Sequence, residues 1–116
     1  MHEMALMGDI LNIIIEDAEQ KGIKQFNNIE LIVGELSNAM PDALEMAFAI
    51  YKEQNPQLFS QDASLHIQHE EALAECVFCQ TRYKPDLKIS ICPSCNMPSG
   101  KLVSGETFQV VSYEGE

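Results

Sequence analysis

The segment AECVFCQTRYKPDLKISICPSC, residues 74–95, contains all four cysteines of the 116-residue chain, arranged as two Cys-x-x-Cys pairs. Cys76 and Cys79 form the first pair, Cys92 and Cys95 form the second, and twelve residues separate the pairs. Two tight turns of this kind can face each other and supply the four thiolates of a tetrahedral Zn²⁺ site. The pattern therefore predicts a closed zinc site, with a dithiol redox site or a disulfide pair as the alternatives.

A lobe around these cysteines would occupy residues 73–104, inserted between two strands of a body formed by residues 1–72 and 105–116. So short a lobe buries little apolar area, and we expect the bound metal to supply most of its folding free energy. The spacer between the pairs is long enough for a β-hairpin. The lobe is also locally basic, since two acidic residues stand against four cations: Arg82, Lys84, Lys88 and Lys101. Nearby cations lower the pKa of cysteine and favour the thiolate that binds a metal.

The body is predicted to contain two amphipathic helices. From Met4 to Lys21 the apolar residues recur at steps of three and four, and Gly22 is typical of the residue that follows a helix. Pro41 suits the first turn of a second helix, because its missing N–H has no partner there in any case. We expect this second helix to end before Asn55.

Three strands complete the body. Apolar residues alternate with other residues over Ile29–Leu36, and Asn27-Asn28 is read as the segment before that strand. A second strand is expected around residues 65–68, and the β-branched and aromatic run Thr107–Tyr113 is expected to form the third. The predicted class is therefore α+β, with two helices packed on a small three-stranded sheet and an inserted rubredoxin-like zinc-ribbon lobe.

The composition limits the classes of partner. The chain has 18 acidic and 7 basic side chains, and its formal charge of −11 would repel a nucleic acid backbone. It has no apolar run near the roughly 20 residues that cross a membrane, so no membrane is expected as a partner. The start shows neither a basic n-region nor a cleavage site for a signal peptide, which indicates a cytoplasmic protein with reduced cysteines.

The sequence begins Met1-His2-Glu3, which places an amine, an imidazole and a carboxylate within three residues. The α-amine, the His2 amide nitrogen and the His2 Nδ1 can enclose one ion in fused five- and six-membered rings. Glu3 could complete or cap that plane. Nitrogen and oxygen donors in this arrangement suit Ni²⁺ or Cu²⁺ better than a structural zinc. The alternative is a frayed chain end with an unengaged histidine.

His66 and His69 precede the first cysteine pair and could be alternative ligands if they lay on a helix. On the strand predicted here they point to opposite faces of the sheet. Because four cysteines already satisfy a zinc ion, the sequence favours solvated or hydrogen-bonded strand histidines.

Several motifs in order resemble the HypA/HybF family of hydrogenase nickel-incorporation proteins. They are Met1-His2-Glu3 before an amphipathic helix, Val33-Gly34-Glu35-Leu36-Ser37, the helix led by Pro41, Ala74-Glu75-Cys76-x-x-Cys79, Cys92-Pro93-x-Cys95 and the late Gly105-Glu106 strand. The resemblance covers essentially the whole chain. It implies a metallochaperone, not an enzyme, that binds a transferable Ni²⁺ near its N-terminus and carries a structural Zn²⁺ on a separate lobe. Such a protein helps to load nickel into the large subunit of [NiFe]-hydrogenase.

Carried over residue by residue, the resemblance makes His2 the essential nickel ligand and Met1 and Glu3 the accompanying donors. The zinc ligands are then Cys76, Cys79, Cys92 and Cys95. The implied partners are the HypB GTPase and the [NiFe]-hydrogenase large-subunit precursor, together with urease maturation proteins in some members of the family.

One departure from the family pattern concerns zinc. Many relatives have a histidine directly after the last cysteine or beside the first pair, whereas Asn96 follows Cys95 here. We therefore expect coordination by four cysteines without exchange for a histidine. Two other functions are to be weighed against nickel delivery: a zinc-ribbon adaptor that binds a protein, and a dithiol oxidoreductase with no bound zinc.

Overall fold

The computed structural model describes residues 2–85 and 91–116. In chain order its elements are α1 (His2–Gln20), β1 (Phe26–Gly34), α2 (Pro41–Gln54), β2 (Phe59–Glu70), β3 (Leu73–Cys76), β4 (Arg82–Tyr83), β5 (Gly100–Ser104) and β6 (Phe108–Gly115). The strands form two sheets, in the orders β2-β1-β6 and β4-β3-β5. This arrangement confirms the predicted α+β class, with two helices, a three-stranded sheet and an inserted lobe that carries the cysteines.

The described residues fall into two compact units. One lies within residues 1–32, 39–68 and 109–116, and the other comprises the described parts of 33–38 and 69–108. Neither described helix combines the length and the apolar character that a bilayer span requires.

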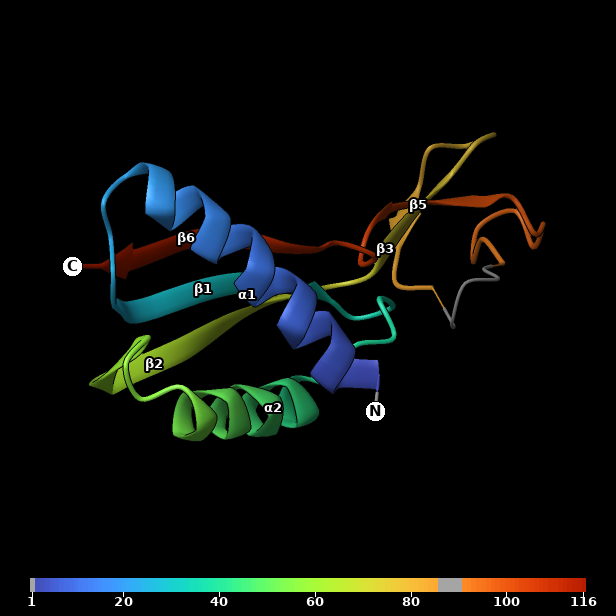
Figure 1. Ribbon diagram of the computed structural model, residues 1–116. Helices are drawn as coiled ribbons and strands as arrows, with labels where there is room; N and C mark the ends of the chain where they lie inside the picture. The colour runs from blue at the N-terminus through green and yellow to red at the C-terminus, as the bar shows by residue number, and fades with distance from the viewer. Residues whose placement is uncertain (1, 86–90) are drawn as a thin grey trace. The chain divides into compact units, whose positions relative to one another are not determined.

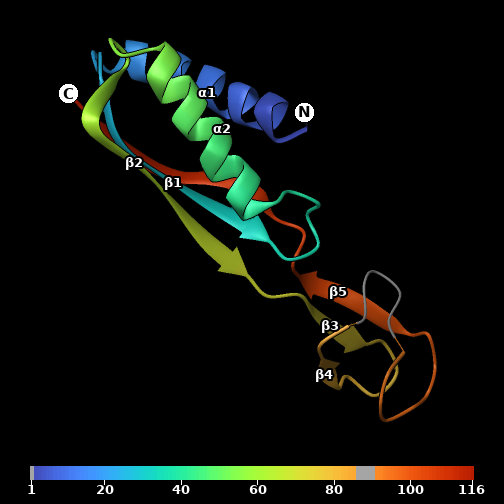
Figure 2. The same cartoon turned by 90° about the horizontal axis from the view of Figure 1, so that it is seen from below.

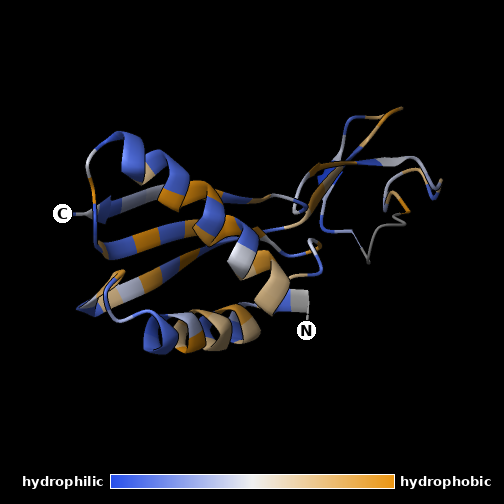
Figure 3. Ribbon diagram, in the orientation of Figure 1, coloured by the Kyte–Doolittle hydropathy of each residue, from blue (hydrophilic) through white to orange (hydrophobic). Residues whose placement is uncertain are grey.

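In the first unit, α1 and α2 lie on the same face of the sheet β2-β1-β6 (Figures 1 and 2). Hydrophobic and hydrophilic residues alternate along β1 (Figure 3), as expected for a strand with one buried face. Ile29 and Leu31 of β1 are fully buried, as are Met7 of α1 and Leu44 of α2. Each of these large side chains stabilises the unit by about 1.5–3 kcal/mol relative to an exposed position.

The first strand begins earlier than the sequence indicated. Asn27 and Asn28 lie within β1 and do not precede it. Ser64 Oγ on β2 donates a hydrogen bond to Asn28 Oδ1 at 3.4 Å, so the polar side chain has a partner on the neighbouring strand. The second strand is also longer than the strand predicted around residues 65–68, since β2 extends over Phe59–Glu70.

In the second unit, β3 pairs antiparallel with both β4 and β5. Within the spacer between the cysteine pairs, β4 pairs with β3, which precedes the first pair. Residues 86–90 of that spacer lie outside the described residues, so the hairpin expected within it stays a prediction. The segment 33–38 bonds to the residues directly after β5, because Gly34 N–H donates to Thr107 O and Leu36 N–H donates to Gly105 O, both at 2.6 Å. A Cβ on Gly34 would lie 2.3 Å from Gly105 O, so this close crossing requires glycine.

Candidate metal sites

The four cysteine sulfurs lie within 4.8 Å of one another. The Sγ atoms of Cys76 and Cys95 are 3.8 Å apart, and those of Cys79 and Cys92 are 3.6 Å apart. At a Zn–S distance of about 2.3 Å, the sulfurs of a tetrahedral site are separated by about 3.8 Å. A disulfide would need about 2.0 Å. The donor set therefore fits a four-coordinate zinc ion.

The two cysteine pairs adopt the same local turn. Gln80 N–H donates to Cys76 O at 2.9 Å, and Asn96 N–H donates to Cys92 O at 2.8 Å. The residue after each pair is left-handed, with φ of 64° at Gln80 and 58° at Asn96. Asparagine tolerates this conformation better than most residues with a side chain. The same turn used twice directs both sulfurs of each pair toward the other pair.

Hydrogen-bond donors surround the first cysteine. The N–H groups of Phe78 and Cys79 each donate to Cys76 Sγ at 3.4 Å, and Ser99 Oγ lies 3.1 Å from that sulfur. The Cys79 N–H, followed by the Ser99 hydroxyl, lowers the pKa of Cys76 to about 6. Hydrogen bonds to the thiolate favour its charged form, which is the form that binds a metal.

The fourth sulfur shows why this cluster needs a cation. The hydrogen bond between Cys95 and Cys79, followed by burial and the other nearby sulfurs, raises the pKa of Cys95 to about 12. Four thiolates at this spacing repel one another unless a positive ion neutralises them. Thr81 Oγ1 lies 3.2 Å from Cys79 Sγ in the same way as Ser99 Oγ lies beside Cys76. The sequence did not identify these two hydroxyls as neighbours of the sulfurs, because serine and threonine near a cysteine have no diagnostic spacing.

The predicted N-terminal site is described only in part. Met1 lies outside the described residues, and His2 is described as the first residue of α1 without its side chain. Glu3 Oε2 accepts a hydrogen bond of 3.4 Å from the backbone N–H of Met40. The nickel ligand set of Met1, His2 and Glu3 therefore stays a prediction.

The two strand histidines do not belong to the sulfur cluster. Both lie on β2, and His66 Nε2 is 3.4 Å from Ser64 Oγ on the same strand. Among the described residues, the group of side chains placed to hold a metal consists of the four cysteines alone.

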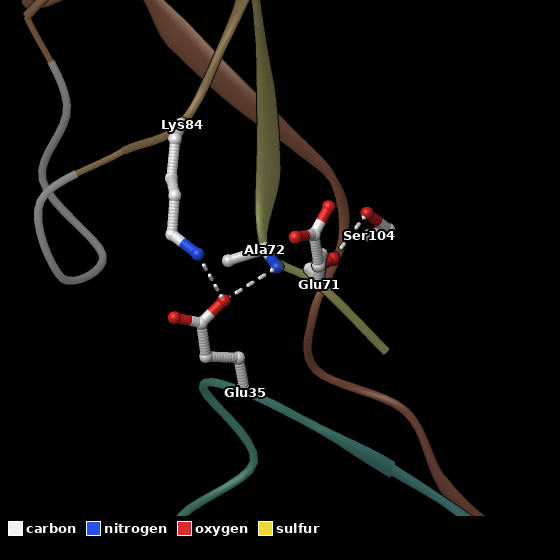
Figure 4. Close-up of polar contacts among 5 residues, drawn as sticks. All are labelled: Glu35, Glu71, Ala72, Lys84 and Ser104. Atoms are coloured by element: carbon white, nitrogen blue, oxygen red, sulfur yellow. Dashed lines mark hydrogen bonds and ion pairs between the residues drawn. The ribbon is translucent and has the colours of Figure 1, made fainter. Parts of the chain in front are cut away.

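A carboxylate fixes the segment 33–38 beside the lobe strands. Glu35 Oε1 accepts the Ala72 N–H and lies near Lys84 Nζ, both at 3.0 Å (Figure 4). The Ala72 N–H, followed by Lys84, lowers the pKa of Glu35. The carboxylate of Glu71 has no such role in this contact. Ser104 Oγ donates a hydrogen bond of 2.7 Å to the backbone carbonyl of Glu71 (Figure 4).

The Ala72 amide resonance should titrate with Glu35. Because the folded pKa of Glu35 is lowered, its stabilising contribution is complete above the usual pKa of 4.5 and disappears as the pH falls through the folded value. NMR titration should therefore give a midpoint below 4.5 for Ala72. Glu35→Gln should remove the transition, whereas Glu71→Gln, which removes the same charge from a neighbouring position, should keep it. Loss of the transition in both variants would contradict the assignment.

Comparisons with known proteins identify the family of this chain. The family profile described as "HypA: Hydrogenase/urease nickel incorporation, metallochaperone, hypA" matches residues 1–115. A "Hydrogenase maturation factor HypA" from Moorella thermoacetica is 35% identical over 116 residues, with 100% of both chains covered. The protein of the same name from Lawsonia intracellularis is 34% identical over 121 residues, also with 100% of both chains covered.

Two solved structures share the fold. The "Solution structure of HypA protein" has a TM-score of 0.68 at 24% identity, and the match covers 100% of this chain and 97% of that one. The "Solution structure of the Ni metallochaperone HypA from Helicobacter pylori" has a TM-score of 0.64 at 22% identity, covering 97% and 96% of the two chains.

Proposed function

The chain belongs to the HypA family of hydrogenase and urease nickel-incorporation metallochaperones, and we propose that it binds Ni²⁺ at its N-terminus and delivers it to a [NiFe]-hydrogenase under maturation. The observation that carries this proposal is the family match over residues 1–115. Membership confirms the resemblance predicted from the sequence motifs.

The start of α1 is chemically suited to the proposed nickel site. The first N–H groups of an α-helix have no acceptor within the helix, so the His2 amide can lose its proton to a metal without breaking a helical bond. The positive end of the helix dipole also favours the resulting anionic nitrogen. With an unblocked amine at Met1, the His2 imidazole and Glu3 complete a donor set that leaves the ion accessible to the ligands of a recipient.

Zinc has a different role in this proposal. The ligands Cys76, Cys79, Cys92 and Cys95 fill a tetrahedral shell, which leaves no position for a substrate and makes the site structural. We assign residues 73–104 to the zinc lobe and residues 1–72 with 105–116 to the nickel domain. Neither proposed site supplies a catalytic group, so the chain would act as a carrier and not as an enzyme.

The family also suggests where the nickel goes. We propose the HypB GTPase and the hydrogenase large-subunit precursor as partners, with urease maturation proteins as further recipients. The formal charge of −11 argues against nucleic acid. Four thiols in ligand geometry require reducing conditions, which supports a cytoplasmic setting.

Acetylating the amine of Met1 tests the proposal. Acetylation removes one nitrogen donor and the five-membered chelate ring, so nickel affinity measured by calorimetry should fall by more than about tenfold, equivalent to about 1.4 kcal/mol. Zinc content, measured by elemental analysis, should not change. If the unmodified chain takes up no nickel, the proposal is wrong and the zinc-ribbon adaptor is favoured. Undiminished uptake after acetylation would place the site elsewhere.

A further inference from the structure

The N-terminal end of α1 is held to α2 by a tyrosine hydroxyl. Tyr51 Oη, on α2, donates a part-buried hydrogen bond of 3.1 Å to the backbone carbonyl of Met4. In an α-helix this carbonyl already accepts the N–H of the residue four positions later, which is Gly8. Tyr51 therefore adds a bond from outside the helix to a carbonyl directly after His2 and Glu3.

Gly8 makes room for this hydroxyl. A Cβ built on Gly8 would lie 2.8 Å from Tyr51 Oη and 3.6 Å from Tyr51 Cζ. Glycine is among the least favourable residues in a helix interior, and position 8 lies well within the 19-residue α1. The approach of the Tyr51 hydroxyl to Met4 gives a physical reason for glycine at this place.

The opposite end of α1 has a comparable bond. Tyr113 Oη, on β6, donates to Asp17 Oδ2, and Asp17 also forms an ion pair of 2.9 Å with Lys21. Two tyrosine hydroxyls therefore hold the two ends of the same helix. Only Tyr51 acts near the residues proposed to bind nickel.

We propose that Tyr51 is a positioning residue for the nickel site, and that its hydroxyl, admitted by Gly8, fixes the first turn of α1 on which His2 and Glu3 stand. This inference rests on the proposed function. The chelate includes a backbone nitrogen, so binding requires a defined backbone conformation in that turn. When a ligand binds only the ordered conformers of a protein, its apparent association constant is the intrinsic constant multiplied by the ordered fraction. The Tyr51 bond increases the ordered fraction, and the Met40 N–H bond to Glu3 acts in the same direction.

Tyr51→Phe should weaken nickel binding, whereas Tyr113→Phe should not. Each variant removes one hydroxyl that donates a hydrogen bond to one end of α1. The loss of a hydrogen bond of ordinary strength lowers an equilibrium constant about three- to tenfold, and we expect that decrease in nickel affinity for Tyr51→Phe. At saturation its nickel absorption spectrum should match that of the unaltered chain, because the donors are the same, while nickel release to a competing chelator should be faster.

Two results would overturn this assignment. One is nickel affinity in Tyr51→Phe equal to that of the unaltered chain. The other is an equal loss in Tyr113→Phe, which would show a general effect of helix stability. If acetylation lowers nickel affinity but Tyr51→Phe does not, the proposed function stands and the role of Tyr51 is wrong. Absence of nickel binding by the unaltered chain would remove both.

A substitution at Gly8 separates the hydrogen bond from packing. Gly8→Ala places a methyl group against the hydroxyl and should lower both thermal stability and nickel affinity. Adding Tyr51→Phe removes the clashing oxygen, so the double variant should regain thermal stability, because alanine is the better helix former. Its nickel affinity should stay at the level of Tyr51→Phe. Full recovery of nickel affinity in the double variant would show that packing, and not the hydroxyl, positions the turn.

Discussion

Replacing His2 by alanine should abolish nickel binding, while zinc content and helix content remain those of the unaltered chain. The imidazole closes the six-membered chelate ring, and without it only the five-membered ring between the amine and the amide nitrogen of residue 2 remains. Changes in the outer shell of a metal site alone reduce affinity by about 10–100-fold, so loss of a direct ligand should exceed that. His2 is the first residue of α1, and the interior hydrogen bonds of the helix do not depend on its side chain.

Calorimetry with Ni²⁺, elemental analysis for zinc and circular dichroism would measure the three quantities. His66→Ala is the matched control, since it removes an imidazole from β2 and should leave all three unchanged. In the unaltered chain, nickel affinity should also fall under mild acid, because binding displaces protons from an imidazole of pKa about 6.5 and an amine of pKa about 8. Nickel affinity retained by His2→Ala would refute the assigned site.

The parts of this protein that could be predicted are those coded by local spacing. Two residues between cysteines define a turn, so the sequence was sufficient to predict the sulfur cluster. Apolar periodicity likewise predicted both helices, and α2 ends at Gln54, before Asn55, as expected. The predicted start of the first strand was wrong, because asparagine usually marks turns and Asn27 and Asn28 were placed before the strand. In the structure Asn28 lies within the strand and accepts a hydrogen bond from Ser64, 36 residues later.

The parts that could not be predicted depend on residues far apart in the chain. Glu35 meets Ala72 across 37 positions, and Tyr51 meets Met4 across 47. A sequence contains no local sign of such contacts, because an exposed glutamate and a helical tyrosine have many possible partners. The reason for a glycine within α1 at position 8 is likewise visible only in the fold, which places the Tyr51 hydroxyl beside it.

Replacing Cys76 by alanine should remove zinc and the order of the lobe while the helices and the sheet β2-β1-β6 stay folded. Cys76 and Cys92 are fully buried, and the lobe strands β3, β4 and β5 have only 4, 2 and 5 residues. Structural zinc contributes roughly 10–16 kcal/mol to small domains of this kind, which packing among such short strands cannot replace. The core of the first unit has its own buried residues and needs no metal.

Amide NMR spectra would distinguish the two parts of the chain. In Cys76→Ala the resonances of Ala74 and Leu102 should collapse to random-coil positions, whereas those of Ile29 and Phe48 should keep their native shifts. Thr81→Ala is the control, because it removes a hydroxyl beside Cys79 but no zinc ligand, and it should retain zinc and all native shifts. Unfolding of the whole chain in Cys76→Ala would contradict the prediction, since it would mean that the body cannot fold without the zinc lobe.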